Sequence, residues 1–190
     1  MCVSNQNNVF VQPSTQNMTK IHLITIFLLI FASGFSFVQC SEGDRSSHFP
    51  RTLGNLALSR VVKGEQATRI INNMHGKILD ECDNYIVFYG GGNSKNTLYV
   101  SAYENDEIAK SNLTEMAMKM AKRAAVFSPL THSKMGKIVC FQTEGMGLKH
   151  YFYRVDALLV WLQVEPGNAK PVSDDLFNFD FASLKADMNL

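Results

Sequence analysis

The chain has 190 residues, of which 46% are hydrophobic, 11% aromatic and 18% charged. This is the composition of a globular protein with room for one domain of ordinary size. Its formal net charge is +1, and Lys20 is the one charged residue among residues 1–40, so the rest of the chain is neutral. A neutral chain lacks the basic surface that nucleic-acid binding requires, which excludes a nucleic-acid partner.

The amino end carries a targeting signal. From Met18 the chain shows one basic residue, Lys20, then an apolar run over residues 21–38 and a polar, charged segment. A basic start, an apolar centre and small residues near its end predict a secretory signal peptide over residues 18–40. An uncleaved membrane anchor is the alternative, since about 18 apolar residues can span a bilayer.

Cys40 ends the apolar run and is followed by a serine. It therefore occupies the place of the lipidated cysteine in a bacterial lipoprotein signal, although Gln39 departs from the small residue expected there. Cleavage by ordinary signal peptidase after Cys40 is the alternative. Both routes predict an extracytoplasmic protein, in the periplasm or at the outer envelope surface. Its contact with the membrane would run through an N-terminal lipid or an uncleaved anchor.

Two further cysteines, Cys82 and Cys140, belong to the exported part of the chain. Each lies in or beside an expected strand, and an oxidising compartment would allow them to form a disulfide. Two buried thiols that act as small hydrophobic side chains are the alternative. The sequence has no CxxC and no Cys/His cluster of the kind that binds zinc.

The rest of the chain predicts two helices among six strands. Ala67, Ile70, Ile71 and Met74 share one helical face, which indicates a helix over residues 65–76. A second helix, capped by Asn105 or Asp106, is expected over residues 106–125. Runs rich in β-branched and aromatic residues predict strands at 55–62, 84–89, 97–103, 137–143, 148–155 and 158–164.

The order of these elements, β-α-β-β-α-β-β-β, predicts an α+β fold. The economical arrangement is a two-layer sandwich, a mainly antiparallel sheet with both helices on one face. Its first six elements match a ferredoxin-like split βαβ pattern, and additional C-terminal strands follow. The expected divisions are an early, mis-assigned start at 1–17, the signal at 18–40, a linker at 41–51, the domain at 52–166 and an acidic tail at 167–190.

The segment "TEGMGLKHYFY", residues 143–153, contains the strongest candidate for a site. Two glycines between strand-like runs are typical of a tight hairpin turn, where positive φ is needed. The hairpin would place His150 on one face of its strand and Tyr151 on the other. The functional alternative is a pocket lined by Glu144, His150 and Tyr151, with Met146 at its rim.

His75, at the end of the first helix, is the best partner for His150. A histidine at a helix C-terminus interacts favourably with the helix dipole, so a structural role is available. The alternative is that His75, His150 and Met146 hold a transition metal or a haem iron. His132 is a further ligand candidate. The absence of CxxCH argues against covalent haem.

Three segments, "NMHGK", "LYVSAYENDEIA" and "EGMGLKHYFYRVDALLVWL", are similar to segments of exported bacterial proteins of about this size. The similarity covers most of residues 50–166. No activity is established for that group. The resemblance therefore implies an exported, small α+β domain and assigns no functional residue.

The sequence shows no recognisable catalytic set: it lacks G-x-S-x-G, and its paired carboxylates flank turns rather than apolar pockets. We therefore expect a non-catalytic binding or envelope-associated module without a cofactor, which binds its unidentified ligand at the sheet or hairpin edge. The alternative is a periplasmic haem- or metal-binding redox accessory protein that uses His75 and His150.

Overall fold

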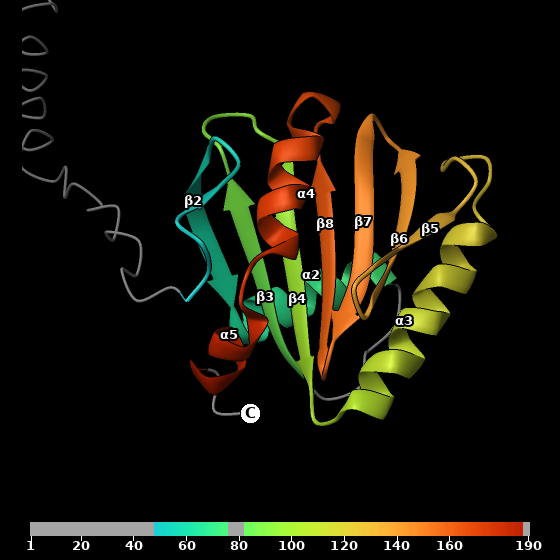
Figure 1. The fold of residues 1–190 in the computed structure, drawn as a ribbon, viewed down its shortest axis with the longest axis horizontal. Helices are drawn as coiled ribbons and strands as arrows, with labels where there is room; N and C mark the ends of the chain where they lie inside the picture. Colours follow the sequence, from blue (N-terminus) through green and yellow to red (C-terminus); the bar gives the residue numbers. More distant parts are fainter. Residues whose placement is uncertain (1–47, 76–81, 188–190) are drawn as a thin grey trace, which may run out of the picture. The chain divides into compact units, whose positions relative to one another are not determined.

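The structure is a computed structural model that describes residues 48–75 and 82–187 (Figure 1). All of these belong to one compact unit, residues 41–190. The signal peptide, Cys40 and the upstream residues 1–17 lie outside the described residues, so the expectations about them stay predictions. None of the helices in 48–75 and 82–187 has the length and hydropathy of a membrane span.

An eight-stranded sheet forms the centre of the domain. Its strands stand in the order β1-β2-β3-β4-β8-β7-β6-β5, and every neighbouring pair is antiparallel. Strands that follow one another in the chain therefore pair within two meanders, β1 to β4 and β5 to β8, the first with α2 inserted between β2 and β3. The two meanders join where β4 pairs with β8. The strands are β1 (Thr52–Leu53), β2 (Leu56–Lys63), β3 (Cys82–Tyr89), β4 (Asn96–Tyr103), β5 (Thr131–Met135), β6 (Ile138–Gly145), β7 (Leu148–Val155) and β8 (Leu158–Val164).

Helices cover both faces of this sheet. On one face α2 (Gly64–His75) packs on β2 and β3, while α3 (Asp106–Ala121) packs mainly on β7 and β8. On the other face lie α4 (Ala169–Phe177) and α5 (Phe181–Asp187), which follow a 3-10 turn at Pro166–Asn168. Figure 1 shows α4 in front of the middle strands and α2 behind them.

The predicted fold class is confirmed: the domain is α+β, with an open antiparallel sheet and the order β-α-β-β-α-β at its start. Both predicted helices lie on one face. The strand pairing differs from a ferredoxin-like unit, in which a crossover helix joins parallel strands. Here the strands that α2 joins, β2 and β3, are antiparallel neighbours.

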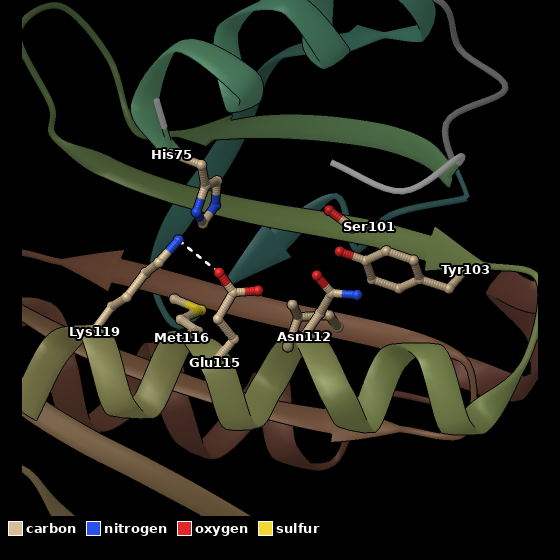
Figure 2. A pocket seen from close by; sticks show the side chains of 8 residues that line it. His75, Ser101, Tyr103, Asn112, Glu115, Met116 and Lys119 are labelled. Carbon is tan, nitrogen blue, oxygen red and sulfur yellow. Dashed lines mark ion pairs between the residues drawn. The ribbon is translucent and has the colours of Figure 1, made fainter. Parts of the chain in front are cut away.

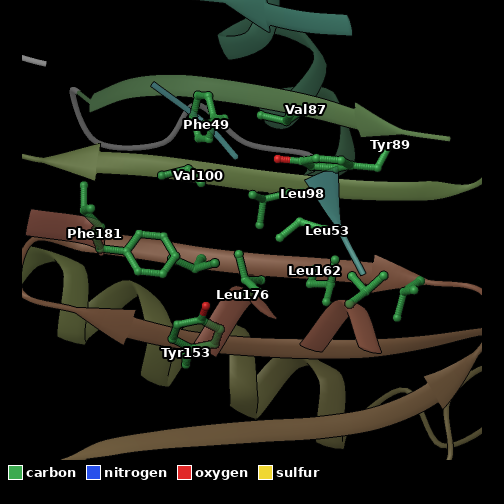
Figure 3. Close-up of a cluster of buried hydrophobic side chains, with 14 of the residues drawn as sticks. Phe49, Leu53, Val87, Tyr89, Leu98, Val100, Tyr153, Leu162, Leu176 and Phe181 are labelled. Carbon is green, nitrogen blue, oxygen red and sulfur yellow. The ribbon is translucent and has the colours of Figure 1, made fainter. Parts of the chain in front are cut away.

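A second difference is the helical layer formed by α4 and α5, in the segment expected to be an acidic tail. Alternate residues of β8 point to this layer and lie in the main core together with Leu176 and Phe181 (Figure 3). Intervening residues of β8, such as Trp161, pack on the α3 side instead. Because β8 is covered on both faces, it is apolar almost throughout, as "LLVWLQV" shows.

The hairpin that contains His150 has a two-residue turn. Gly145 pairs with Leu148, and the residues between them, Met146 and Gly147, have φ angles of 56° and 77°. Positive φ at both central positions is the geometry of a type I′ hairpin turn, which fits the twist of the flanking strands. The expectation of positive φ at Gly145 is wrong, because Met146 takes that conformation instead.

Gly145 is required for a different reason. A Cβ at this position would lie 2.2 Å from Cδ1 of Phe127 and 2.8 Å from the backbone oxygen of Val126. Phe127 forms an isolated antiparallel β-bridge with Gly145, the last residue of β6. Phe127 lies in the segment that precedes β5. The glycine therefore allows the chain before β5 to lie directly against the hairpin.

Candidate functional site

A shallow depression lies between α2 and α3, over β4 and β8. We call it the interhelical trough. It contains two adjoining hollows, which share the lining residues His75, Met116 and Lys119. The polar hollow is completed by Ser101, Tyr103, Asn112, Glu115 and Leu159, and the apolar hollow by Met74, Met120, Arg123 and Trp161.

The polar hollow is small and filled with internal contacts. In Figure 2 the His75 side chain points from α2 towards Lys119 and Glu115 of α3, whose ion pair spans 2.7 Å. Asn112 donates to the backbone oxygen of Ile108 at 3.0 Å. The cavity volume is about 30 Å³, which accommodates about one water molecule rather than a substrate.

The apolar hollow is lined by methionines over an aromatic floor. Trp161 stacks on Tyr99 of the adjacent strand with ring centroids 5.0 Å apart. Met74 remains 39% exposed above it, and Ile70, one turn earlier on α2, is 38% exposed. The cavity volume is about 60 Å³. Flexible thioethers beside a stacked aromatic pair can adapt to apolar side chains of different shapes.

A second cavity, of about 220 Å³, lies beside the hairpin. It brings together Glu144, His150 and Tyr151, the three residues of the expected pocket. Ordinary polar side chains make up most of the rest of its wall, and Glu144 pairs with Lys149 across 2.9 Å. The other lining residues are Ser128, Pro129, Thr131, Gln142 and Thr143.

His150 itself is 2% exposed and uses both ring nitrogens. Its Nε2 lies 3.1 Å from the backbone oxygen of Gly145, and its Nδ1 accepts a hydrogen bond of 3.3 Å from the indole nitrogen of Trp161. Because the carbonyl can only accept, the proton is on Nε2 and the ring is neutral. Burial lowers the pKa of His150 below its ordinary value, against the smaller opposing effect of the Gly145 carbonyl.

The three residues of the metal or haem hypothesis do not line a common cavity. His75 lies in the interhelical trough and His150 beside the hairpin, while Met146 is at the turn and 74% exposed. His132 lies on β5 near the ring of Phe141. Within the described ranges, no three His, Cys, Asp or Glu side chains gather in a way that could hold a metal ion.

Cys82 and Cys140 are not joined by a disulfide. The sulfur of Cys82 lies 3.4 Å from the side-chain nitrogen of Asn84, on the face covered by α2. Cys140 belongs to the core under α4, on the opposite face. Of the two alternatives, this structure therefore has two thiols rather than a disulfide, because the sheet separates the two side chains.

A further cavity, of about 740 Å³, is a charged depression where several turns and α5 meet. Arg154 forms an ion pair with Asp106 and donates to the backbone oxygen of Asp156 at 2.9 Å. Acidic and basic groups occur in equal number around it, so it favours neither an anion nor a cation. Its charged lining residues are Glu104, Asp106, Lys137, Arg154, Asp156 and Lys185.

Sequence reasoning did not identify the trough. The sequence places Met74 on the apolar face of the first helix and Trp161 in the last expected strand, and neither position by itself indicates a trough. A signal was present in Met74, an apolar residue in the last turn of the first helix. Its meaning depends on the pairing of β4 with β8, which brings Tyr99 and Trp161 together.

No protein-family model, curated protein or solved structure matches this chain. The similarity to exported bacterial proteins therefore stays a prediction, and any function must be argued from the geometry.

Proposed function

We propose that this protein is an exported, non-catalytic binding module and that its ligand-contacting surface is the interhelical trough. One observation carries the proposal: an apolar strip, formed by Met74 and the stacked Tyr99 and Trp161, remains partly open to solvent between two helices. Contiguous apolar surface rimmed by polar groups is typical of interaction sites. The trough replaces the sheet or hairpin edge as our candidate for the contact surface.

The proposal that the module is non-catalytic is supported by the protonation states and hydrogen bonds of the buried titratable groups. Burial raises the pKa of the Cys140 thiol to about 12 and that of Tyr153 well above its ordinary value. Both groups are therefore held in their neutral, unreactive forms. His150, the buried histidine, has both nitrogens in hydrogen bonds, whereas a general base needs a nitrogen that can reach a substrate proton.

Site-specific photo-crosslinking in the cells that make the protein tests the binding surface. A benzophenone amino acid placed at Met74 should yield a discrete cross-linked product with a partner. The matched control is Met118, which lies on α3 outside the trough and is 54% exposed. A product at both positions, or at neither, would argue against the trough as the binding surface.

Export and lipid anchoring are separate parts of the proposal and rest on the amino-terminal sequence. The intact mass of the protein from the envelope fraction tests them. A mass that begins at a diacylated or triacylated Cys40 would support a lipoprotein. A mass that includes residues 18–40 would favour an uncleaved anchor, and recovery from the cytoplasm would contradict export altogether.

A further inference from the structure

The charges around the apolar hollow are not balanced. Lys119 is neutralised by Glu115, one helical turn away. Arg123, just beyond the end of α3, also lines the hollow, and its side chain is exposed. Across residues 48–75 and 82–187 no acidic side chain pairs with its guanidinium. Among the described residues, the apolar floor thus ends at one cation that has no acidic partner.

The dimensions of the trough decide what kind of ligand fits. Pockets that enclose a small molecule usually have volumes of roughly 300–1,000 Å³. The two hollows of the trough are about 30 and 60 Å³. They have room for individual groups that project from a larger body, not for a ligand enclosed as a whole. A polypeptide lying across α2 and α3 is such a body.

We propose that the trough binds a segment of a partner polypeptide in which a bulky apolar side chain is flanked by an acidic residue. The apolar side chain enters between Met74 and Met120 over Trp161, and the carboxylate pairs with Arg123. A guanidinium offers two parallel N–H donors to a carboxylate, so the pair fixes the direction of the segment as well as adding affinity. This inference rests on the proposed function, and it adds the chemistry of the ligand.

Selection from a phage library of random linear peptides tests this proposal on the protein purified from the cells that export it. Selected peptides should share an acidic residue beside a large apolar one. A synthetic peptide of the selected sequence should change the fluorescence of Trp161, the one tryptophan in the chain. Its affinity should fall at least about tenfold in Arg123→Glu, because the substitution replaces attraction by repulsion at the rim.

Lys122→Glu is the matched control. Lys122 is exposed, adjoins Arg123 and undergoes the same change of charge, but it does not line either hollow. Its affinity for the peptide should stay close to that of the wild type. Circular dichroism checks that both variants fold.

The outcomes separate the inference from the proposed function. If peptide binding is lost in Met74→Glu but is the same in Arg123→Glu and wild type, the trough is a binding surface and the acidic preference is wrong. If no selected peptide depends on Met74, both the inference and the trough are wrong. Equal losses in Arg123→Glu and Lys122→Glu would indicate general charge attraction and would also overturn the inference.

Discussion

At Gly145 the chain has no room for a side chain, because Phe127 lies against the position where a Cβ would stand. Gly145→Ala should therefore lower the free energy of unfolding by roughly 1–3 kcal/mol, the usual cost of overpacking. Urea denaturation measures this. Gly167→Ala is the control, since a Cβ there meets nothing within 4 Å. Equal stabilities of the two variants would contradict the contact with Phe127.

His150 should make stability depend on pH. Its pKa is lowered in the folded protein by burial, so the unfolded chain takes up a proton first as the pH falls. The contribution to the unfolding free energy is complete above the ordinary pKa of 6.5 and is lost as the pH decreases towards the folded-state pKa. Protonation of Nδ1 also removes the acceptor for the Trp161 indole, so Trp161 fluorescence should change over the same range.

The matched comparison for this prediction uses two histidine substitutions. The difference between unfolding free energies at neutral and mildly acidic pH should shrink in His150→Gln and persist in His132→Gln, since His132 lies on the exposed edge strand β5. An unchanged pH dependence in His150→Gln would show that other groups cause it.

At the scale of single residues the sequence predicted much of the hairpin correctly. It located the turn and put His150 and Tyr151 on opposite faces of their strand. It did not predict the reason for Gly145, because that depends on Phe127, which alternation within the hairpin does not place. Nor did it predict that the indole of Trp161, on the neighbouring strand β8, donates a hydrogen bond to His150.

Among the elements, α4 is the one whose contribution to the main core was not predicted from the sequence. Leu176 is completely buried in the main core, between the helix and the sheet. Leu176→Ala should cost about 2–5 kcal/mol of unfolding free energy, since it removes buried apolar atoms and leaves a cavity. Denaturation of the purified variant measures this loss.

Lys170→Ala, on the exposed face of the same helix, is the control and should leave stability nearly unchanged. Its partner in the ion pair, Asp174, is also exposed, and exposed pairs contribute little. If Leu176→Ala proved as stable as Lys170→Ala, α4 would be a loosely attached tail and the second helical layer would be wrong.

The two C-terminal helices escaped prediction because their apolar positions are few and interrupted. Val172 and Leu176 recur one helical turn apart, as do Phe181 and Leu184, but in residues 177–180 phenylalanines alternate with an amide and an acidic residue, which interrupts the helical period. The other six strands and the helices α2 and α3 have longer periodic runs, and these were predicted with boundaries within a few residues of those observed. The short strands β1 and β5 were also missed, since each contains too few alternating residues.

For the molecule as a whole, the sheet separates the two thiols. Alkylation in denaturant without a reductant should therefore modify both Cys82 and Cys140, as intact mass would show. In the folded protein Cys140 should resist modification, because it is buried and its pKa is raised to about 12. A reductant should not change the urea midpoint. Protection of both cysteines in denaturant until reductant is added would reveal a disulfide and contradict the strand arrangement.

The interhelical trough is also a property of the whole molecule, which explains why local sequence patterns did not predict it. Its walls come from helices before and after β4, and its floor comes from two strands that are distant in the chain. Hydrophobic periodicity identifies each element and its buried face. It does not say which strand will stand beside β4, and that choice sets the space between α2 and α3.

The pairing of β4 with β8 has a kinetic consequence. Each meander pairs strands that follow one another in the chain, with α2 between β2 and β3, so its contacts are comparatively local. Joining the two meanders requires closure of a longer loop. Tyr99 and Trp161 face each other across that junction. The fluorescence of Trp161 therefore reports when the two meanders pair. During refolding it should reach its native value after the circular dichroism signal of the separate meanders.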